Sequence, residues 1–137
     1  MKNRNKTRTE VSKFYKLQNG QWLKIVFASF SRGSRWFMDI CVADSKRKCN
    51  DCIHKPSKSP KRVFGEHTGN NAGLEPFIIA LKSLLAFELT VKNTEIRILG
   101  FNSKLTHIYS RLVRYGYTVK TVKCADGISR DMTCKYV

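Results

Sequence analysis

A run of small and polar residues stands immediately before the most regular helical pattern of the chain. Asn70-Asn71-Ala72-Gly73-Leu74 leads into it, and Pro76 falls in the first helical turn. The N-terminus of a helix exposes unpaired N–H groups and the positive end of the helix dipole, so a turn of this composition is able to hold a phosphate. An ordinary connection into a helix is the other interpretation of these residues.

The surrounding stretch, Thr68 to Tyr117, resembles the cofactor-binding half of the GNAT family of N-acetyltransferases. In that family a loop of the form Arg/Gln-x-x-Gly-Ile/Leu-Gly/Ala binds the pyrophosphate of coenzyme A, and Asn70 to Glu75 looks like that loop. The family's next helix is introduced by Asn and carries Tyr seven residues later, as Asn102 and Tyr109 do here. The resemblance implies a GNAT-like fold that uses acetyl-CoA, with cofactor contacts from Asn70, Asn71, Ala72, Gly73, Leu74 and Asn102.

The resemblance also implies a direct acyl transfer. A strand ending near Gly65 would open and offer a backbone N–H to the thioester oxygen, where it stabilises the developing negative charge. Tyr109 would protonate the departing thiolate, and Glu66 or His67 would accept the proton of the attacking amine. Other roles fit these residues too, because Glu66 suits a surface ion pair in a basic chain and Tyr109 lies on an apolar stripe typical of a core.

Two alternatives use the same segment. Asn70 stands where the family has Arg or Gln, and Glu75 stands where it has a second Gly, so a non-catalytic scaffold without cofactor is one alternative. The other is an RNase H-like order of elements, in which Asn70-Asn71 would open the first helix. Two-metal phosphodiester cleavage needs several carboxylates around Mg²⁺. The predicted first strand contains none, so an active nuclease is not expected.

Three cysteines and one histidine gather within fourteen residues, at Cys41, Cys49, Cys52 and His54. The Cys49-x2-Cys52 spacing allows one tight turn to present two thiolates to zinc. Free thiols in a basic loop are the other interpretation, since structural zinc sites usually draw on two such ligand pairs.

The charge of the chain is strongly unbalanced. It has 26 Lys and Arg against 10 Asp and Glu, a net charge of +16. Such an excess attracts polyanions, so nucleic acid is the expected partner, and an acidic protein would satisfy the same charge. No helix-turn-helix, C2H2 finger or RNA-recognition signature is present, so sequence-specific binding is not predicted. Phosphate contacts are expected from an N-terminal arm and a central loop, at Lys2, Arg4, Lys6, Arg8, Lys46, Arg47, Lys48, Lys55, Lys58, Lys61 and Arg62.

Length and composition limit the architecture that positions these residues. The chain has 137 residues, enough for one hydrophobic core, and residues 1–20 are predicted to be a basic arm outside the globular part at 21–137. Within the arm, the spacing of Val11, Phe14 and Tyr15 indicates a short helix. No apolar run reaches the roughly 20 residues that span a bilayer, and the first ten residues do not resemble a signal peptide, so an intracellular location is expected.

The remaining elements alternate between strands and helices. Two aromatic and β-branched runs at 21–30 and 34–43 predict antiparallel strands, followed by a long basic loop at 44–60. Gly116 is expected to end the second helix in a left-handed conformation. The later elements are predicted as a third strand at 61–67, a helix at 74–89, a central parallel strand at 94–101, a helix at 103–115, and a hairpin of 117–123 with 128–136 around Asp126-Gly127. The predicted fold is a single α/β domain with a mixed sheet, in the order β-β-β-α-β-α-β-β.

Overall fold

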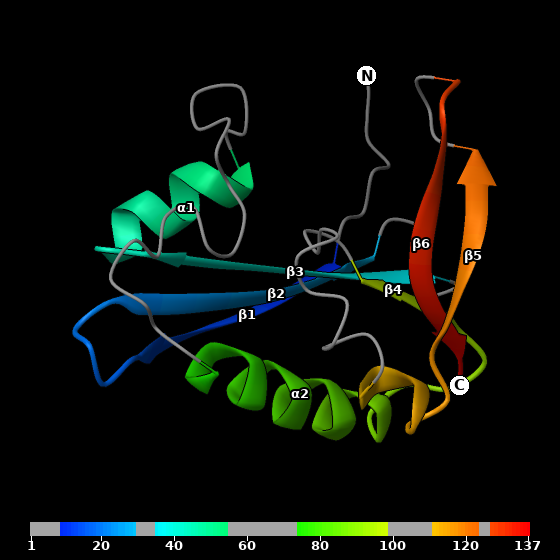
Figure 1. Cartoon of the computed structure of the whole chain (residues 1–137), viewed down its shortest axis with the longest axis horizontal. Coiled ribbons are helices and arrows are strands. Elements are labelled where there is room, and N and C mark those ends of the chain that lie inside the picture. The colour runs from blue at the N-terminus through cyan, green and yellow to red at the C-terminus, as the bar shows by residue number, and fades with distance from the viewer. Residues whose placement is uncertain (1–8, 30–34, 55–73, 99–110, 124–126) are drawn as a thin grey trace.

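The computed structural model describes residues 9–29, 35–54, 74–98, 111–123 and 127–137. Within these ranges six strands form one mixed sheet in the order β1-β2-β3-β4-β6-β5 (Figure 1). The strands are β1 (Thr9–Lys16), β2 (Trp22–Ser29), β3 (Arg35–Ala43), β4 (Glu95–Ile98), β5 (Thr118–Lys123) and β6 (Ser129–Tyr136). Helices α1 (Lys46–His54) and α2 (Glu75–Glu88) lie on opposite faces of this sheet. The predicted α/β class with a single mixed sheet is confirmed.

The strand directions change at the centre of the sheet. Strands β1, β2 and β3 are antiparallel neighbours, whereas β4 joins β3 in parallel, with pairs from Arg35–Glu95 to Met38–Ile98. Strand β6 is antiparallel to β4 and lies between β4 and β5. The strand predicted at 94–101 is therefore confirmed over residues 95–98 as a central strand, parallel to one neighbour and antiparallel to the other.

The first strand corrects the sequence analysis. Val11, Phe14 and Tyr15 were predicted to form a helix in a basic arm, and this was wrong, since they belong to β1 and pair along their whole length with β2. The three apolar positions have helical spacing, but in the strand Phe14 packs on the α1 side of the sheet and Tyr15 on the α2 side, so pairing with β2 overrides the local pattern. Gly20, with φ of 92°, closes the connection between the two strands.

The second correction concerns the predicted loop at 44–60, because residues 46–54 form helix α1. The helix begins after Ser45, whose hydroxyl accepts a hydrogen bond from the N–H of Lys48 at 3.1 Å, as an N-cap residue does. Few apolar residues mark this helix, and Cys49 is its one buried side chain among those described. The sequence therefore had too few apolar residues here to show a helical period. Residues 55–60 and the predicted strand at 61–67 lie outside the described residues.

The main core lies between the sheet and α2. The ring of Phe87 on α2 stacks on Phe27 of β2, with ring centres 4.1 Å apart, and meets Trp36 of β3 edge-on at 5.0 Å. Leu84 of α2 is fully buried in the same cluster. The predicted helix at 74–89 is thus confirmed over Glu75–Glu88, with Ala80, Leu84 and Phe87 buried while Ile78 is exposed.

The C-terminal part follows the prediction closely. Residues 111–113 are helical, and Gly116 ends this segment with φ of 94°, while the N–H of Tyr117 donates to the carbonyl of Leu112. The rest of the predicted helix, 103–110, lies outside the described residues. The predicted hairpin forms, but Lys123 pairs with Ser129, so five residues connect the strands. No described helix is both long and apolar enough to cross a membrane.

Candidate functional site at the centre of the sheet

The backbone of β3 changes its partner at the centre of the sheet. The N–H of Leu17 donates to the carbonyl of Gln21, which fixes the hydrogen-bonding phase of the β1–β2 pair. Opposite residues in an antiparallel pair of strands alternate between hydrogen-bonded and non-hydrogen-bonded pairs. With this phase, the backbones of Lys24 and Cys41 form a hydrogen-bonded pair between β2 and β3. Ile40, one residue earlier, must direct its N–H away from β2 and toward the β4 side.

This N–H lies beyond the last described pair of the parallel strands. That pair joins Met38 and Ile98, and the N–H of Ile40, two residues further along β3, donates to Oδ1 of Asp39 at 2.9 Å. Asp39 is only 9% exposed. A proton acceptor and a backbone donor therefore stand side by side on β3, two residues beyond its last described pair with β4.

Asp39 was not identified in the sequence analysis, although a signal was present. It is the only acidic residue in the apolar run at 34–43, and a carboxylate is costly to bury without hydrogen bonds. Lys24, in the neighbouring strand, has the same character. It is 4% exposed, and its Nζ donates to Oδ1 of Asn50 on α1 at 2.6 Å.

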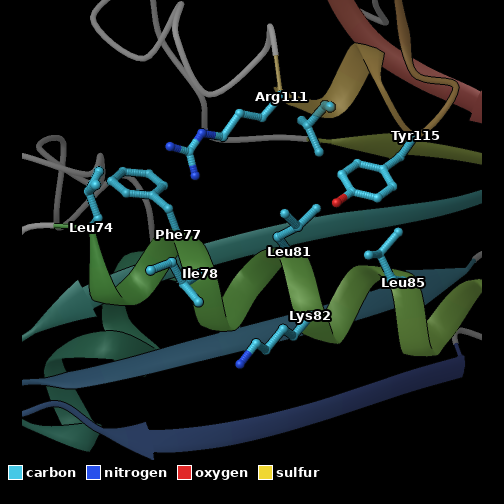
Figure 2. A pocket seen from close by; sticks show the side chains of 9 residues that line it. Leu74, Phe77, Ile78, Leu81, Lys82, Leu85, Arg111 and Tyr115 are labelled. Carbon is cyan, nitrogen blue, oxygen red and sulfur yellow. The ribbon is translucent and has the colours of Figure 1, made fainter.

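A cavity of about 250 Å³ separates α2 from the segment at residues 111–115. Its walls are mostly apolar, and Figure 2 shows the guanidinium of Arg111 directed toward Phe77, near the start of α2. The phenol of Tyr115 points toward Leu81 in the same view. The described lining residues are Leu74, Phe77, Ile78, Leu81, Lys82, Leu85, Arg111, Leu112 and Tyr115.

The first turn of α2 has no side-chain cap. Leu74, the described end of the predicted cofactor loop, occupies the cap position, and Pro76 follows it without an N–H to satisfy. Glu75 turns its carboxylate to the β1–β2 connection, where Oε1 accepts the N–H of Gln18 at 2.9 Å. The acidic group that departs from the family's loop is thus held by a backbone donor of another element.

Most of the predicted catalytic and cofactor residues lie outside the described residues. Leu74 is the exception, since it lines the cavity and is about half exposed. The predicted residues that the structure does not describe are Glu66, His67, Asn70, Asn71, Ala72, Gly73, Asn102 and Tyr109. Their roles stay predictions.

Basic side chains gather on α1 and the adjoining edge of the sheet. Lys46, Arg47 and Lys48, three of the predicted phosphate contacts, are exposed on the first half of α1. Lys46 and Lys16 of β1 both lie against the ring of Trp22, with Nζ 4.6 Å and 4.8 Å from its centre. The sequence analysis missed Lys16, because only the structure brings it beside α1. The other predicted contacts, Lys2, Arg4, Lys6, Arg8, Lys55, Lys58, Lys61 and Arg62, lie outside the described residues.

Two of the four predicted zinc ligands come together. Cys41 lies in β3, as expected, and Cys49 of α1 packs against it in a small buried cluster. Cys52 and His54 belong to α1, but their side chains are outside what the structure describes. Among the described residues no group of three His, Cys, Asp or Glu is arranged to hold a metal ion.

Comparison with protein-family models, with curated proteins and with solved structures found no match.

Proposed function

We propose that this chain is a GNAT-like, acyl-CoA-dependent N-acyltransferase, or a derivative of one, that works in association with nucleic acid. The observation that carries the proposal is the direction of the Ile40 N–H, which faces the β4 side of β3 beyond the last described pair of the parallel strands. The family resemblance requires a strand beside the central parallel strand that offers a backbone N–H to a thioester. Strand β3 is suited to that role, in place of the segment 61–67 assigned to it from the sequence.

The chain's own groups would divide the work as follows. Acetyl-CoA, when bound, supplies the activated acyl group. The N–H of Ile40 is the donor for the carbonyl oxygen once Asp39 releases it, and the Asp39 carboxylate accepts the proton of the attacking amine. Tyr109 keeps the role that the resemblance implies, as donor to the departing thiolate.

The described residues fit a pyrophosphate at the start of α2. The first turn lacks a side-chain cap, Pro76 has no N–H and the N–H of Phe77 donates to the carbonyl of Leu74, so the N–H of Glu75 is the donor that this turn offers to an anion. The Glu75 carboxylate is bonded to the N–H of Gln18, and the guanidinium of Arg111 extends toward the same end of the helix (Figure 2). These three features offset the replacements at Asn70 and Glu75 that favour a scaffold without cofactor.

Calorimetry with acetyl-CoA, on protein freed of nucleic acid, tests the proposal. We expect saturable binding to the native chain and to Asp39→Asn with a similar Kd, because Asp39 acts on the amine. Transfer of the acetyl group to a lysine-rich probe peptide should fall about 100-fold or more in Asp39→Asn, the contribution usual for a general base. Asp131→Asn, an exposed carboxylate on β6, is the matched control and should keep full activity. Absence of binding at millimolar acetyl-CoA would refute the proposal.

A non-catalytic polyanion binder is the second candidate, and the α1 basic surface favours it. We define this surface as Lys16, Lys46, Arg47 and Lys48, four cations of which only Lys48 has a described ion pair, with Asp44 at 3.7 Å. In single-stranded nucleic acid, cations bind the backbone phosphates and a neighbouring aromatic ring stacks on a base. An acidic protein surface would meet the same charges, and a pull-down that survives nuclease treatment would identify that case.

Fluorescence anisotropy with a single-stranded oligonucleotide measures the second candidate. Replacing Lys46, Arg47 and Lys48 by Ala should weaken binding for every base sequence and reduce the slope of log K against log salt by about 2, since each lost phosphate contact removes about 0.7. The matched control is Lys92→Ala, an exposed lysine between α2 and β4. An equal loss in both variants, or a salt slope unchanged by the triple replacement, would exclude the α1 basic surface.

A further inference from the structure

Two buried thiols from different elements meet beneath α1. Cys41 of β3 is 3% exposed and Cys49 of α1 is completely buried. The Cys49 thiol donates to the carbonyl of Trp22 at 3.4 Å and lies 3.7 Å from the carbonyl oxygen of Cys41. Both cysteines carry thiols and not a disulfide in the structure. Neither thiol has a part in the proposed acyl transfer.

Helix packing brings the two side chains together. Cys49 lies on α1 and Cys41 on β3, and both belong to one small buried cluster. Two thiols that pack against each other from different elements have the arrangement of a disulfide-forming pair.

We propose that Cys41 and Cys49 are a modification site, a dithiol that a small-molecule disulfide oxidises to an internal bridge between β3 and α1. In the first step the Cys49 thiolate attacks one sulfur of oxidised glutathione, whose S–S bond breaks, and one glutathione thiolate leaves. The Cys41 thiol then gives its proton to solvent, attacks Sγ of Cys49, and expels the second glutathione thiolate. Two protein thiols are oxidised, one glutathione disulfide is reduced, and each departing thiolate takes up a proton.

The bridge would fasten α1, and with it the α1 basic surface, to the sheet. Cys49 is the one buried side chain of α1 among those described, and it packs against Cys41 and Ala43 with Phe14 and Trp22 alongside. In the reduced state the nine-residue helix is held on the sheet by this side chain together with the hydrogen bond from Lys24 to Asn50. Short helices depend on such tertiary contacts for their stability.

Because both thiols are buried, oxidation has to start from molecules in which α1 has opened locally. Opening of this kind is governed by the local stability of the segment. Removing the N-cap hydroxyl with Ser45→Ala should therefore speed oxidation about fivefold, in line with the usual contribution of such a cap. Ser129→Ala, on the distant hairpin, is the matched control and should leave the rate unchanged.

Mass spectrometry of the full chain treated with oxidised glutathione tests the proposal. We expect loss of two hydrogen atoms and a proteolytic fragment in which Cys41 and Cys49 are joined, both in the native chain and in Cys52→Ser. Cys49→Ser should give no internal bridge, and the Cys52→Ser result stands even if Cys49→Ser fails to fold. A bridge between Cys49 and Cys52, a stable glutathione adduct without a bridge, or stoichiometric zinc that protects both thiols would each overturn the proposal.

Discussion

Removing the hydroxyl of Tyr117 should weaken the fold by an amount that the structure allows to be estimated. Tyr117 is 1% exposed, and its hydroxyl donates to Oε2 of Glu88 at 2.6 Å. The other carboxylate oxygen of Glu88 accepts Nζ of Lys135 at 3.0 Å. This network joins the last residue of α2 to β6 and to the residue immediately before β5. Tyr117→Phe removes one hydrogen bond from it and leaves the ring in place.

A hydrogen bond to a charged group contributes about 1.5–3 kcal/mol to stability. Glu88 keeps Lys135 as a partner, and its side chain is 12% exposed, so the lower half of this range applies. We expect Tyr117→Phe to reduce the free energy of unfolding by about 2 kcal/mol. For a chain of this length that corresponds to a fall in Tm of roughly 6 °C.

Urea unfolding of the two proteins gives the comparison. Tyr136→Phe, in which the altered side chain is 69% exposed, is the control and should change stability by less than about 0.5 kcal/mol. A loss below that value in Tyr117→Phe would show that the hydrogen bond to Glu88 does not stabilise the fold.

The same variant predicts a pH dependence. Burial, together with the Glu88 carboxylate, raises the pKa of Tyr117 above its ordinary value. Its stabilising effect is therefore complete below the unfolded pKa of about 10 and is lost as the pH rises beyond it. The difference in stability between the native chain and Tyr117→Phe should narrow above pH 10. A difference that is the same at pH 8 and pH 11 would contradict this reasoning.

Two further predictions concern Glu95, the first residue of β4, and Thr94, the residue before it. The hydroxyl of Thr94 is buried without a hydrogen-bond partner in the structure, so Thr94→Val should raise the free energy of unfolding by about 1 kcal/mol in urea, and a loss of stability would show that the hydroxyl is satisfied in solution. Burial acts to raise the pKa of Glu95, but hydrogen bonds from Lys120 and Arg97 outweigh it and the pKa is lowered overall. The carboxylate therefore stabilises the fold above its unfolded pKa of about 4.3 and ceases to do so as the pH falls through its folded value. Between pH 5 and pH 3 the free energy of unfolding should fall less in Glu95→Gln than in the native chain, as measured by urea unfolding at each pH. An equal fall in the two proteins would contradict this.

Several elements were predictable because their signals are local. The stripe that includes Leu84 repeats at helical spacing, so α2 was found within one residue at each end. Gly116 was expected to take a positive φ because it follows a helix, and it does. The two β-branched runs before residue 44 gave β2 and β3 for the same reason. Each of these segments carries its own pattern, and pairing with distant residues only reinforces it.

The elements that were missed depend on partners far along the chain. Strand β1 has apolar residues at helical spacing, and its pairing with β2 overrides that local pattern. Helix α1 has few apolar residues, and the contact of Cys49 with Cys41 gives it a place on the sheet. In both cases the conformation depends on a contact with residues distant in sequence, so it could not be predicted from the local pattern.

The sequence by itself determined the α/β class and the basic character of the chain, and the cofactor site between Thr68 and Tyr117 is a prediction from it. The tertiary structure decided which groups meet. It directs the Ile40 N–H away from β2 and puts the Asp39 carboxylate beside it. It also brings Cys41 and Cys49 together, and Lys16 beside α1. Composition and periodicity follow from residues near in sequence, whereas a hydrogen-bond direction or a thiol contact follows from strand register and helix packing, which the whole chain fixes together.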